Sequence, residues 1–328
     1  MQITLFVEYY HKRNLPKESL NLAIHYLNQL DEFCRNVGLE SVDQLTTDLL
    51  DQFIQKMRKE TVDKLELLLS IGRYYRLIKR NDLYIHITKY LGKLGVIESI
   101  VSRSEQLTNA TLLETIKEEL CQIDLLTTPE EAPVQLQTIM DTLEKYIEPN
   151  TLDKILAFNH HQIPKSAFDE EVKYYQKANS LDDYLLDLHK RSIDEITRCF
   201  EKNEVWYEQQ ITQRVIDYVS SNQEILSAVR AGNDLYVTKI PYDTEQYLAA
   251  TTDKEKAYHA CHCPFAKEAI RKDHAKISPK WCYCSGGFTK YPFEVIFGKE
   301  LEVTPLELAI HNSTRCRFKI SLEGVDYK

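Results

Sequence analysis

Hydrophobic residues recur at helical spacing over the first 95 positions. Between Pro16 and Gly38 the apolar side chains stand three or four residues apart, and runs with the same period cover 45–57 and 61–79. A period near 3.6 places these side chains on one face of each helix. The pattern predicts successive short helices that pack into a compact helical domain over residues 1–95.

The next stretch, residues 96–200, is acidic and also helical in pattern. Helical windows cover 111–120, 133–147 and 181–200. The sequence TTPEEAP at 127–133 is typical of a helix start, because it offers a threonine cap, a proline and two carboxylates. His160 and His161 are adjacent and would diverge on a helix, so we expect a loop or surface role for them.

The pattern changes after residue 200. Strand composition marks 235–242, 256–263, 299–310 and 315–322, with the turn HNST before the last strand. Short helices are predicted over 244–251, 264–272 and 292–298. The segment WCYCSGG at 281–287 is predicted to be a loop, because two glycines weaken a helix there and Pro292 favours a new helix start.

Together these patterns predict a mostly α protein with a C-terminal α+β domain. We expect a helical bundle followed by an antiparallel sheet with helices on one face. Three domains are expected, at 1–95, 96–200 and 201–328. The composition, with 9 glycines in 328 residues and 43% apolar residues, agrees with a folded and largely helical chain.

Charge is distributed unevenly along the chain. The formal net charge is −9, and it divides into +2 through Gly95 and −11 over the rest. A nucleic-acid contact is therefore expected only at the front, where basic side chains on one face could follow a phosphate backbone. These are Lys56, Arg58, Lys59, Lys64, Arg73, Arg76, Lys79 and Arg80. The alternative is an ordinary solvated surface, since acidic residues alternate with them.

The N-terminal segment MQITLFVEYYHKR lacks the basic and apolar regions of a signal peptide. No stretch approaches the length of a membrane span. We therefore expect a cytoplasmic protein with no membrane partner. In that compartment the eight cysteines are more often free thiols or metal ligands than disulfides.

Five cysteines crowd into the last quarter of the chain and are its strongest chemical signal. Thiolates are soft ligands, and four of them, or three with a histidine, complete a tetrahedral zinc site. The predicted metal ligands are Cys261, Cys263, Cys282, Cys284, Cys316 and His262. Buried, unreactive thiols are one alternative, and a reactive thiol is another.

The reactive alternative centres on Cys284 as a catalytic nucleophile. The backbone amides that follow it, of Ser285, Gly286 and Gly287, could form an oxyanion hole. A nucleophilic thiol needs a base, and the candidate bases are His259, His262 and His274.

A small-molecule site is predicted from aromatic residues around a lysine. Lys239, Tyr242, Tyr283 and Phe288 could line an apolar pocket with a cationic anchor. The alternative is that these aromatic side chains are plain core.

The segments FVEYYHKRNLPKESLNLAIHYL and LLLSIGRYYRLIKRNDLYIHITKYLGKLG carry a family resemblance. In helix order and apolar pattern, residues 1–95 resemble the SAM-like core-binding domain of tyrosine recombinases and phage integrases. The resemblance implies a domain that clamps DNA beside a separate catalytic domain. The recombinase set of Arg, Lys, His-x-x-Arg, His and Tyr has no counterpart, since His311 and Arg315 have the wrong spacing. Recombination is therefore not expected.

The runs CYCSGGF, FEVIFGKELEV and RCRFKI resemble the 4-vinyl reductase domain. That family comprises small-ligand-binding α+β modules of bacterial aromatic-sensing regulators and pigment-biosynthesis proteins, and some members bind zinc. Cys282 and Cys316 match its first and last ligand positions, and 297–299 match its F-x-G-[RK] step. Pro305 and Leu308 stand where the family has Glu and Cys, so other cysteines would have to complete a site.

A weaker similarity links CHCPFAKEA and the C-R-F ending to the L-2-amino-thiazoline-4-carboxylate hydrolases. As a whole, the chain resembles bacterial proteins whose motifs do not reveal a function. The sequence thus predicts a ligand-binding or sensory protein with a zinc-thiolate site and a helical front domain that contacts DNA or protein. One alternative is a small-molecule hydrolase, of amide or thiazoline type, that uses Cys284 or a metal-bound water. Another is a DNA-binding accessory protein without recombinase activity.

Overall fold

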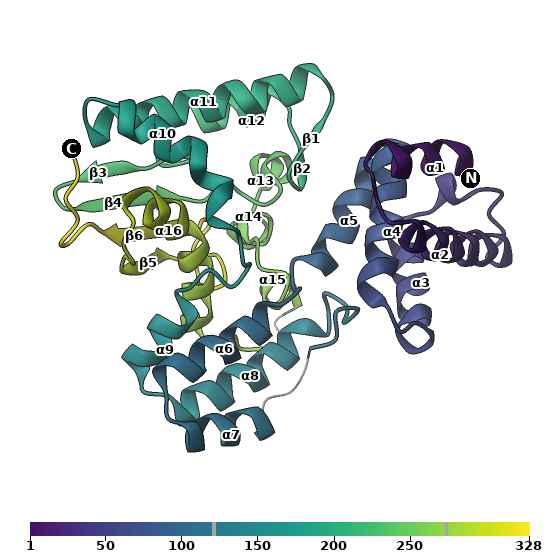
Figure 1. The fold of residues 1–328 in the computed structure, drawn as a ribbon, viewed down its shortest axis with the longest axis horizontal. Coiled ribbons are helices and arrows are strands. Elements are labelled where there is room, and N and C mark those ends of the chain that lie inside the picture. The colour runs from purple at the N-terminus through teal and green to yellow at the C-terminus, as the bar shows by residue number, and fades with distance from the viewer. Residues whose placement is uncertain (120–122, 273–274) are drawn as a thin grey trace. The chain divides into compact units, whose positions relative to one another are not determined.

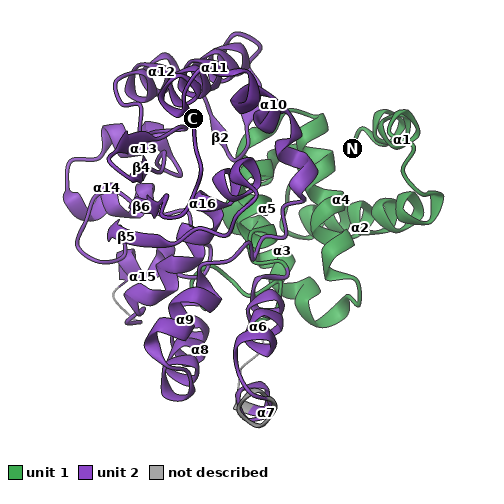
Figure 2. Cartoon of the chain, turned by 60° about the vertical axis from the view of Figure 1, so that its left-hand side comes forward, with its two compact units in different colours: residues 1–94, 123–131 green, residues 95–122, 132–328 purple. Residues whose placement is uncertain are grey.

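The structure, a computed structural model, describes residues 1–119, 123–272 and 275–328. It is mostly α-helical, with an antiparallel sheet in the C-terminal part, as the sequence predicts (Figure 1). The chain divides into two compact units instead of three (Figure 2). The first unit comprises Met1–Leu94 and Ile123–Glu131, and the second comprises Gly95–Gln122 and Ala132–Lys328.

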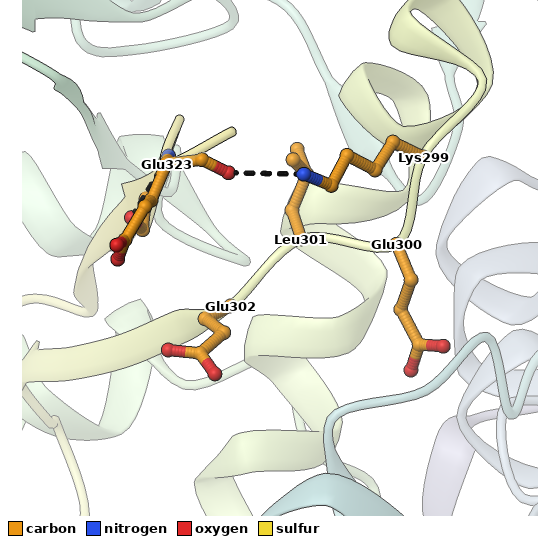
Figure 3. Close-up of a pocket in the computed structure, with 6 residues that line it drawn as sticks. Lys299, Glu300, Leu301, Glu302 and Glu323 are labelled. Carbon is orange, nitrogen blue, oxygen red and sulfur yellow. Dashed lines mark hydrogen bonds between the residues drawn. The ribbon is translucent and has the colours of Figure 1, made fainter. Parts of the chain in front are cut away.

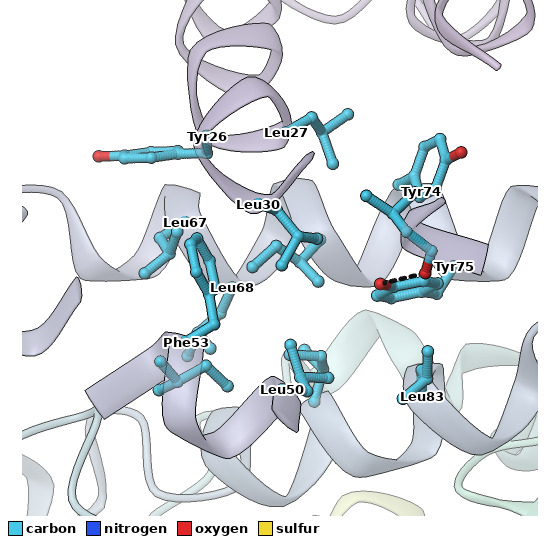
Figure 4. Close-up of a cluster of buried hydrophobic side chains, with 14 of the residues drawn as sticks. Tyr26, Leu27, Leu30, Leu50, Phe53, Leu67, Leu68, Tyr74, Tyr75 and Leu83 are labelled. Atoms are coloured by element: carbon cyan, nitrogen blue, oxygen red, sulfur yellow. Dashed lines mark hydrogen bonds between the residues drawn. The ribbon is translucent and has the colours of Figure 1, made fainter. Parts of the chain in front are cut away.

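The first unit contains the short helices that the apolar period predicts. They are α1 (Ile3–Lys12), α2 (Lys17–Asn36), η1 (Val42–Gln44), α3 (Thr47–Glu60), α4 (Lys64–Leu77) and α5 (Asn81–Leu91). Polar side chains cap three of them: Ser41, Thr46 and Asp63 each accept a hydrogen bond from an amide of the first turn. Figure 4 shows the core, where Leu27 and Leu30 of α2 pack among side chains of α3, α4 and α5.

Residues 123–131 return to the first unit after the chain has visited the second, and we call them the return segment. Leu126 is fully buried in the core of the first unit. The side-chain amide of Gln55 donates to the carbonyl of Leu126 at 2.8 Å, and Lys93 donates to the carbonyl of Thr127. The first segment of this unit ends at Leu94, next to the predicted boundary at 95. The predicted domain lacks the return segment, which supplies part of the unit's core.

The second unit begins with helices and ends with the sheet. Its helices up to residue 201 are α6 (Val96–Leu107), α7 (Ala110–Glu119), α8 (Ala132–Tyr146), α9 (Pro149–Leu156), η2 (Lys165–Phe168), α10 (Asp169–Lys177) and α11 (Leu181–Glu201). These confirm the three predicted helical windows. The acidic stretch forms no unit of its own, because it packs with the C-terminal part.

A four-stranded antiparallel sheet has the order β3-β4-β6-β5. The strands are β3 (Val229–Ala231), β4 (Asp234–Thr238), β5 (Val303–Glu307) and β6 (Arg317–Ser321), and a separate pair joins β1 (Val205–Trp206) to β2 (Gln209–Gln210). Val237 lies opposite Phe318, and Leu235 lies opposite Ile320. Because neighbours opposite each other share a face, these four buried side chains form one apolar side of the sheet.

The remaining helices of the second unit are α12 (Gln213–Ser220), α13 (Thr244–Ala249), α14 (Asp253–Ala260), α15 (Lys267–Lys272), η3 (Pro279–Cys282) and α16 (Tyr283–Phe297). The predicted strand over 256–263 is wrong, because most of it belongs to α14. A capping box explains the helix: Thr252 and Glu255 each accept from the other's backbone amide. In KAYHACHC the first five residues are the end of α14, and the last three follow this helix.

The predicted loop at WCYCSGG is also wrong. Residues 281 and 282 end the 3₁₀ turn η3, and α16 follows without a break and runs through Pro292. Gly286 and Gly287 allow other parts of the chain to pack closely against the helix. A Cβ on Gly287 would lie 2.4 Å from the backbone oxygen of Phe158, and one on Gly286 would lie 3.1 Å from Val303. Helix α16 can therefore approach the chain after α9 on one side and the sheet on another.

Candidate functional site

The five C-terminal cysteines lie at the ends of different elements of the second unit. Cys261 and Cys263 follow α14, Cys282 ends η3, Cys284 is in the first turn of α16, and Cys316 precedes β6. All but Cys263 are buried, and all five are free thiols. The amide of Lys239, just after β4, donates to the carbonyl of Cys316 at 2.9 Å. The fold thus brings together the thiols and the lysine that the sequence singled out.

Burial and mutual proximity control the ionisation of these thiols. Burial raises the pKa of Cys282, and the neighbouring thiols of Cys316, Cys261, Cys263 and Cys284 raise it further. Burial likewise raises the pKa of Cys284 to about 12. Since negative charges so close together repel, the group stays protonated at neutral pH unless a cation compensates it.

The charge of Lys239 lowers the pKa of Cys263, Cys284 and Cys316, against the larger effect of their burial. The Nζ of Lys239 donates to the hydroxyl of Ser285 at 3.1 Å and lies 5.0 Å from the ring centre of Phe288. Burial lowers the pKa of Lys239, against an opposing effect of four of the thiols. Among the described residues, no carboxylate lies within ion-pair distance of Lys239.

His262 lies beside the thiols with its ring already engaged. Its Nε2 donates to the carbonyl of Ile240 at 2.6 Å, and its ring meets that of Tyr242 edge-on at 5.5 Å. Burial holds the pKa of His262 well below its usual range, so the imidazole is neutral. Trp281 donates from Nε1 to the sulfur of Cys263 at 3.1 Å, which orients this thiol as well.

The four predicted ligand-binding residues are only partly brought together. Lys239 and Phe288 are in contact, and Tyr242 lies behind His262, under the ammonium of Lys267 at 4.1 Å. Tyr283 lies near Asp153 and under Lys280, at 5.9 Å. Tyr283 therefore does not contact Lys239 and Phe288 in the way that the prediction requires, because residues of a helix point in different directions.

The donor chemistry of the thiol group suits a soft metal such as zinc. Its placement does not yet form a coordination shell. Over the residues that the structure describes, no three His, Cys, Asp or Glu side chains are placed so that they could hold one ion. Zinc binding would require these side chains to move towards a common point.

The nucleophile prediction for Cys284 finds no support in its surroundings. Gly286 and Gly287 lie past the first three residues of helix α16, so their amides donate to helix carbonyls and cannot form an oxyanion hole. The third predicted amide, of Ser285, lies in the first turn, which leaves one donor instead of three. Of the candidate bases, His262 is bound to Ile240 and His274 lies outside the described residues. Within the described chain, no histidine hydrogen-bonds to the Cys284 sulfur.

Two residues that the sequence did not assign to the site lie beside Lys239. Ser285 shares a face of α16 with Phe288, three residues on, which a helix prediction at WCYCSGG would have revealed. His161 meets the Phe288 ring edge-on at 5.5 Å, and burial and the charge of Lys239 lower the pKa of His161.

The loop or surface role expected for His160 and His161 is confirmed, since both lie in a turn and His161 is exposed, but His160 is not at the surface. His160 is fully buried, and its ring nitrogens contact the hydroxyl of Ser99 at 3.0 Å and the carbonyl of Ile155 at 2.9 Å. Burial lowers the pKa of His160 to about 4. It is a neutral structural histidine.

A shallow pocket of about 210 Å³ lies at the start of β5, away from these residues in sequence (Figure 3). Its lining contains the carboxylates of Glu300, Glu302 and Glu323. Lys299 donates to the backbone carbonyls of Glu323 and Gly324 at 3.2 and 2.8 Å. With little apolar lining and its lysine engaged, this pocket has few features of a ligand site.

In the first unit, half of the predicted basic face is paired within the unit. Arg58 pairs with Glu131 of the return segment at 2.7 Å, and Lys64 pairs with Asp124. Arg73 and Arg80 pair with the nearby carboxylates of Glu66 and Asp82. DNA contact therefore stays a prediction with fewer cations, namely Lys56, Lys59, Arg76 and Lys79.

No helix in the described part of the chain is long and apolar enough to cross a membrane. The family resemblances in the sequence stay predictions. Comparison of the chain with protein-family models, with curated proteins and with solved structures found no match.

Proposed function

We propose that this protein is a ligand-binding or sensory protein whose second unit holds a small molecule at Lys239. The observation that supports this is the setting of the Lys239 ammonium, which has a hydroxyl, a ring and thiols around it but no carboxylate among the described residues. Removing a charge from water without a counter-charge costs free energy, and such groups gather at functional sites. A cytoplasmic setting would keep the surrounding thiols free.

Thermal unfolding of the full chain tests this proposal. Lys239→Met and the exposed control Lys254→Met are compared with the unmodified protein against small anionic, cationic and neutral aromatic compounds. A ligand at a hundredfold excess over its Kd stabilises the folded state by about 2.7 kcal/mol. We expect at least one compound to raise the unfolding temperature of the unmodified protein and of Lys254→Met, but not of Lys239→Met. If no compound does so, the proposal is wrong.

A second candidate function is zinc binding, favoured by the five neighbouring thiols. Bound zinc would ionise the thiols that hold it, and Lys239 would then balance part of their negative charge. The candidate ligands are the predicted ones, and bound metal would tie the exit of α14 to η3 and β6.

Metal analysis of protein purified without a His-tag tests zinc binding. If this second candidate is correct, the protein contains one zinc per chain, chelator lowers its unfolding temperature, and Cys282→Ala and Cys316→Ala lose the metal. Cys34→Ala and Cys199→Ala are the controls, because these cysteines are buried elsewhere. Zinc binding would be excluded if the purified protein contains no metal and chelator does not change its unfolding temperature.

A further inference from the structure

The residues around Lys239 define which class of small molecule it would hold, provided that the proposed ligand site exists. Two groups on one face of α16 flank the ammonium: the Ser285 hydroxyl at 3.1 Å and the Phe288 ring at 5.0 Å. The first is a hydrogen-bonding group and the second an apolar surface. A ligand here meets a charged end and an aromatic end.

The aromatic end of this site is accessible to solvent. Phe288 is 39% exposed, and the ring of His161, an exposed residue whose imidazole is nonetheless partly desolvated, meets it edge-on. Lys239 and Ser285 are part-buried behind it. Since neither Lys239 nor Ser285 is fully buried, and the ammonium lies 5.0 Å from the centre of the Phe288 ring, a molecule that covers this ring is close to both groups.

Among the described residues, Lys239 is the cation whose charge lowers the pKa of His161. The neighbouring His262 is neutral, and Lys267 acts on it together with Lys239. The other groups that act on Lys239 are thiols. A single ammonium with an adjacent hydroxyl matches a monoanion, whereas phosphate dianions are usually held by several cations or by arginine forks.

We propose that Lys239 and Ser285 bind the carboxylate of a small aromatic acid, whose ring packs against Phe288 and His161. The ammonium and the hydroxyl both donate to the carboxylate oxygens, and charge-assisted hydrogen bonds of this kind are the stronger ones. The acid supplies the counter-charge that the protein does not provide, while its ring covers the exposed part of Phe288.

Calorimetric titration of the full chain with benzoate and with its neutral analogue benzamide tests this proposal. We expect benzoate to bind about tenfold more tightly than benzamide, which corresponds to about 1.4 kcal/mol. Lys239→Met should remove this preference. Ser285→Ala should weaken benzoate binding about threefold, and Lys254→Met should leave it unchanged.

The outcomes separate this inference from the proposed function. Equal binding of benzoate and benzamide, or a benzoate affinity unchanged in Lys239→Met, would overturn the carboxylate assignment and leave a ligand site of another class. Inorganic phosphate that competes more strongly than benzoate would overturn it too. Stoichiometric zinc would make Lys239 a counter-ion of thiolates and exclude the acid. Only a failure with compounds of every charge would also remove the ligand site.

Discussion

The two units differ in how they treat buried positive charge. In the first unit, the ammonium of Lys93 donates to the carbonyl of Thr127 and lies 5.0 Å from the ring of Tyr90. Arg58 beside it reaches Glu131 of the return segment. In the second unit, Lys239 has the Ser285 hydroxyl but no acid among the described residues. Among the described residues no acid forms an ion pair with Lys93 either, but the carboxylates of Asp124, Glu131 and Asp51 act on its charge, whereas thiols act on that of Lys239.

The second unit also contains a buried lysine, Lys290, that does have an acidic partner. Lys290 is 2% exposed and pairs with Glu294 at 2.5 Å, while it donates to the carbonyl of Leu301 at 2.6 Å. Lys290 therefore ties α16 to the start of β5. A buried lysine with such partners is structural, so the lack of equivalent partners at Lys239 indicates a different role.

The largest expected effect separates these two lysines. Lys290→Met leaves the Glu294 carboxylate and a carbonyl without their donor, so we expect the free energy of unfolding to fall by about 3–5 kcal/mol. Lys239→Met removes a charge that lacks an acid, so the free energy of unfolding should stay the same or rise. Urea unfolding of both variants measures the difference. Equal losses would show that Lys239 is as structural as Lys290.

The next effect concerns the return segment. Leu126→Ala empties a fully buried position in the first unit, so we expect a loss of about 3 kcal/mol in the unfolding free energy of that unit. Leu125→Ala is the matched control. The side chain of Leu125 is only partly buried, so its removal should lower the unfolding free energy by less. Denaturant unfolding of the full chain, followed by protease sensitivity of residues 1–94, gives the readout. If Leu126→Ala leaves the unfolding free energy of that unit unchanged, the return segment is not part of that core.

The smallest expected effect is a pH-dependent loss of stability in the second unit, caused by His160. The pKa of buried His160 is about 4, against about 6.5 in an unfolded chain. As pH falls from 6.5 to 4, the unfolded state takes up the proton first, so the folded state loses stability, on the order of 2 kcal/mol. Above pH 6.5 the contribution is fully present.

A His160→Gln variant provides the control for this pH dependence. It cannot take up the proton, so its stability should fall less between pH 6.5 and 4 than that of the unmodified protein. Parallel pH profiles of the two proteins would show that His160 is not the group responsible.

The sequence predicted the helices of the first unit well, because they follow a local apolar period and polar side chains cap three of them. The turn at Thr46 and the run to Met57 lie within one helix and its cap, so no distant contact was needed to recognise them. The strands β4, β5 and β6 were also recognised from composition. Two short segments were predicted wrongly: 256–263, where strand and helix signals compete, and 281–287, where loop and helix signals compete.

The failure at 281–287 has its cause in tertiary packing. Gly286 and Gly287 lower the helix propensity of their segment, but they permit contacts with Val303 and with the backbone of Phe158 that no local pattern reveals. Tertiary packing repays the lost propensity, so α16 forms where a loop was expected. The corrected helix then places Ser285 and Phe288 on one face beside Lys239.

Residue types and their order were enough to identify a helical front, a C-terminal sheet, a lysine and five thiols as the chemistry of this chain. They could not show that Leu126 completes a core 30 or more positions earlier in the chain, or that Lys239 meets a hydroxyl and a ring but no acid. Spacing along a chain reports neighbours within a helix or a strand. The partner of a buried charge depends on which distant segments pack around it, and only the folded structure contains that information.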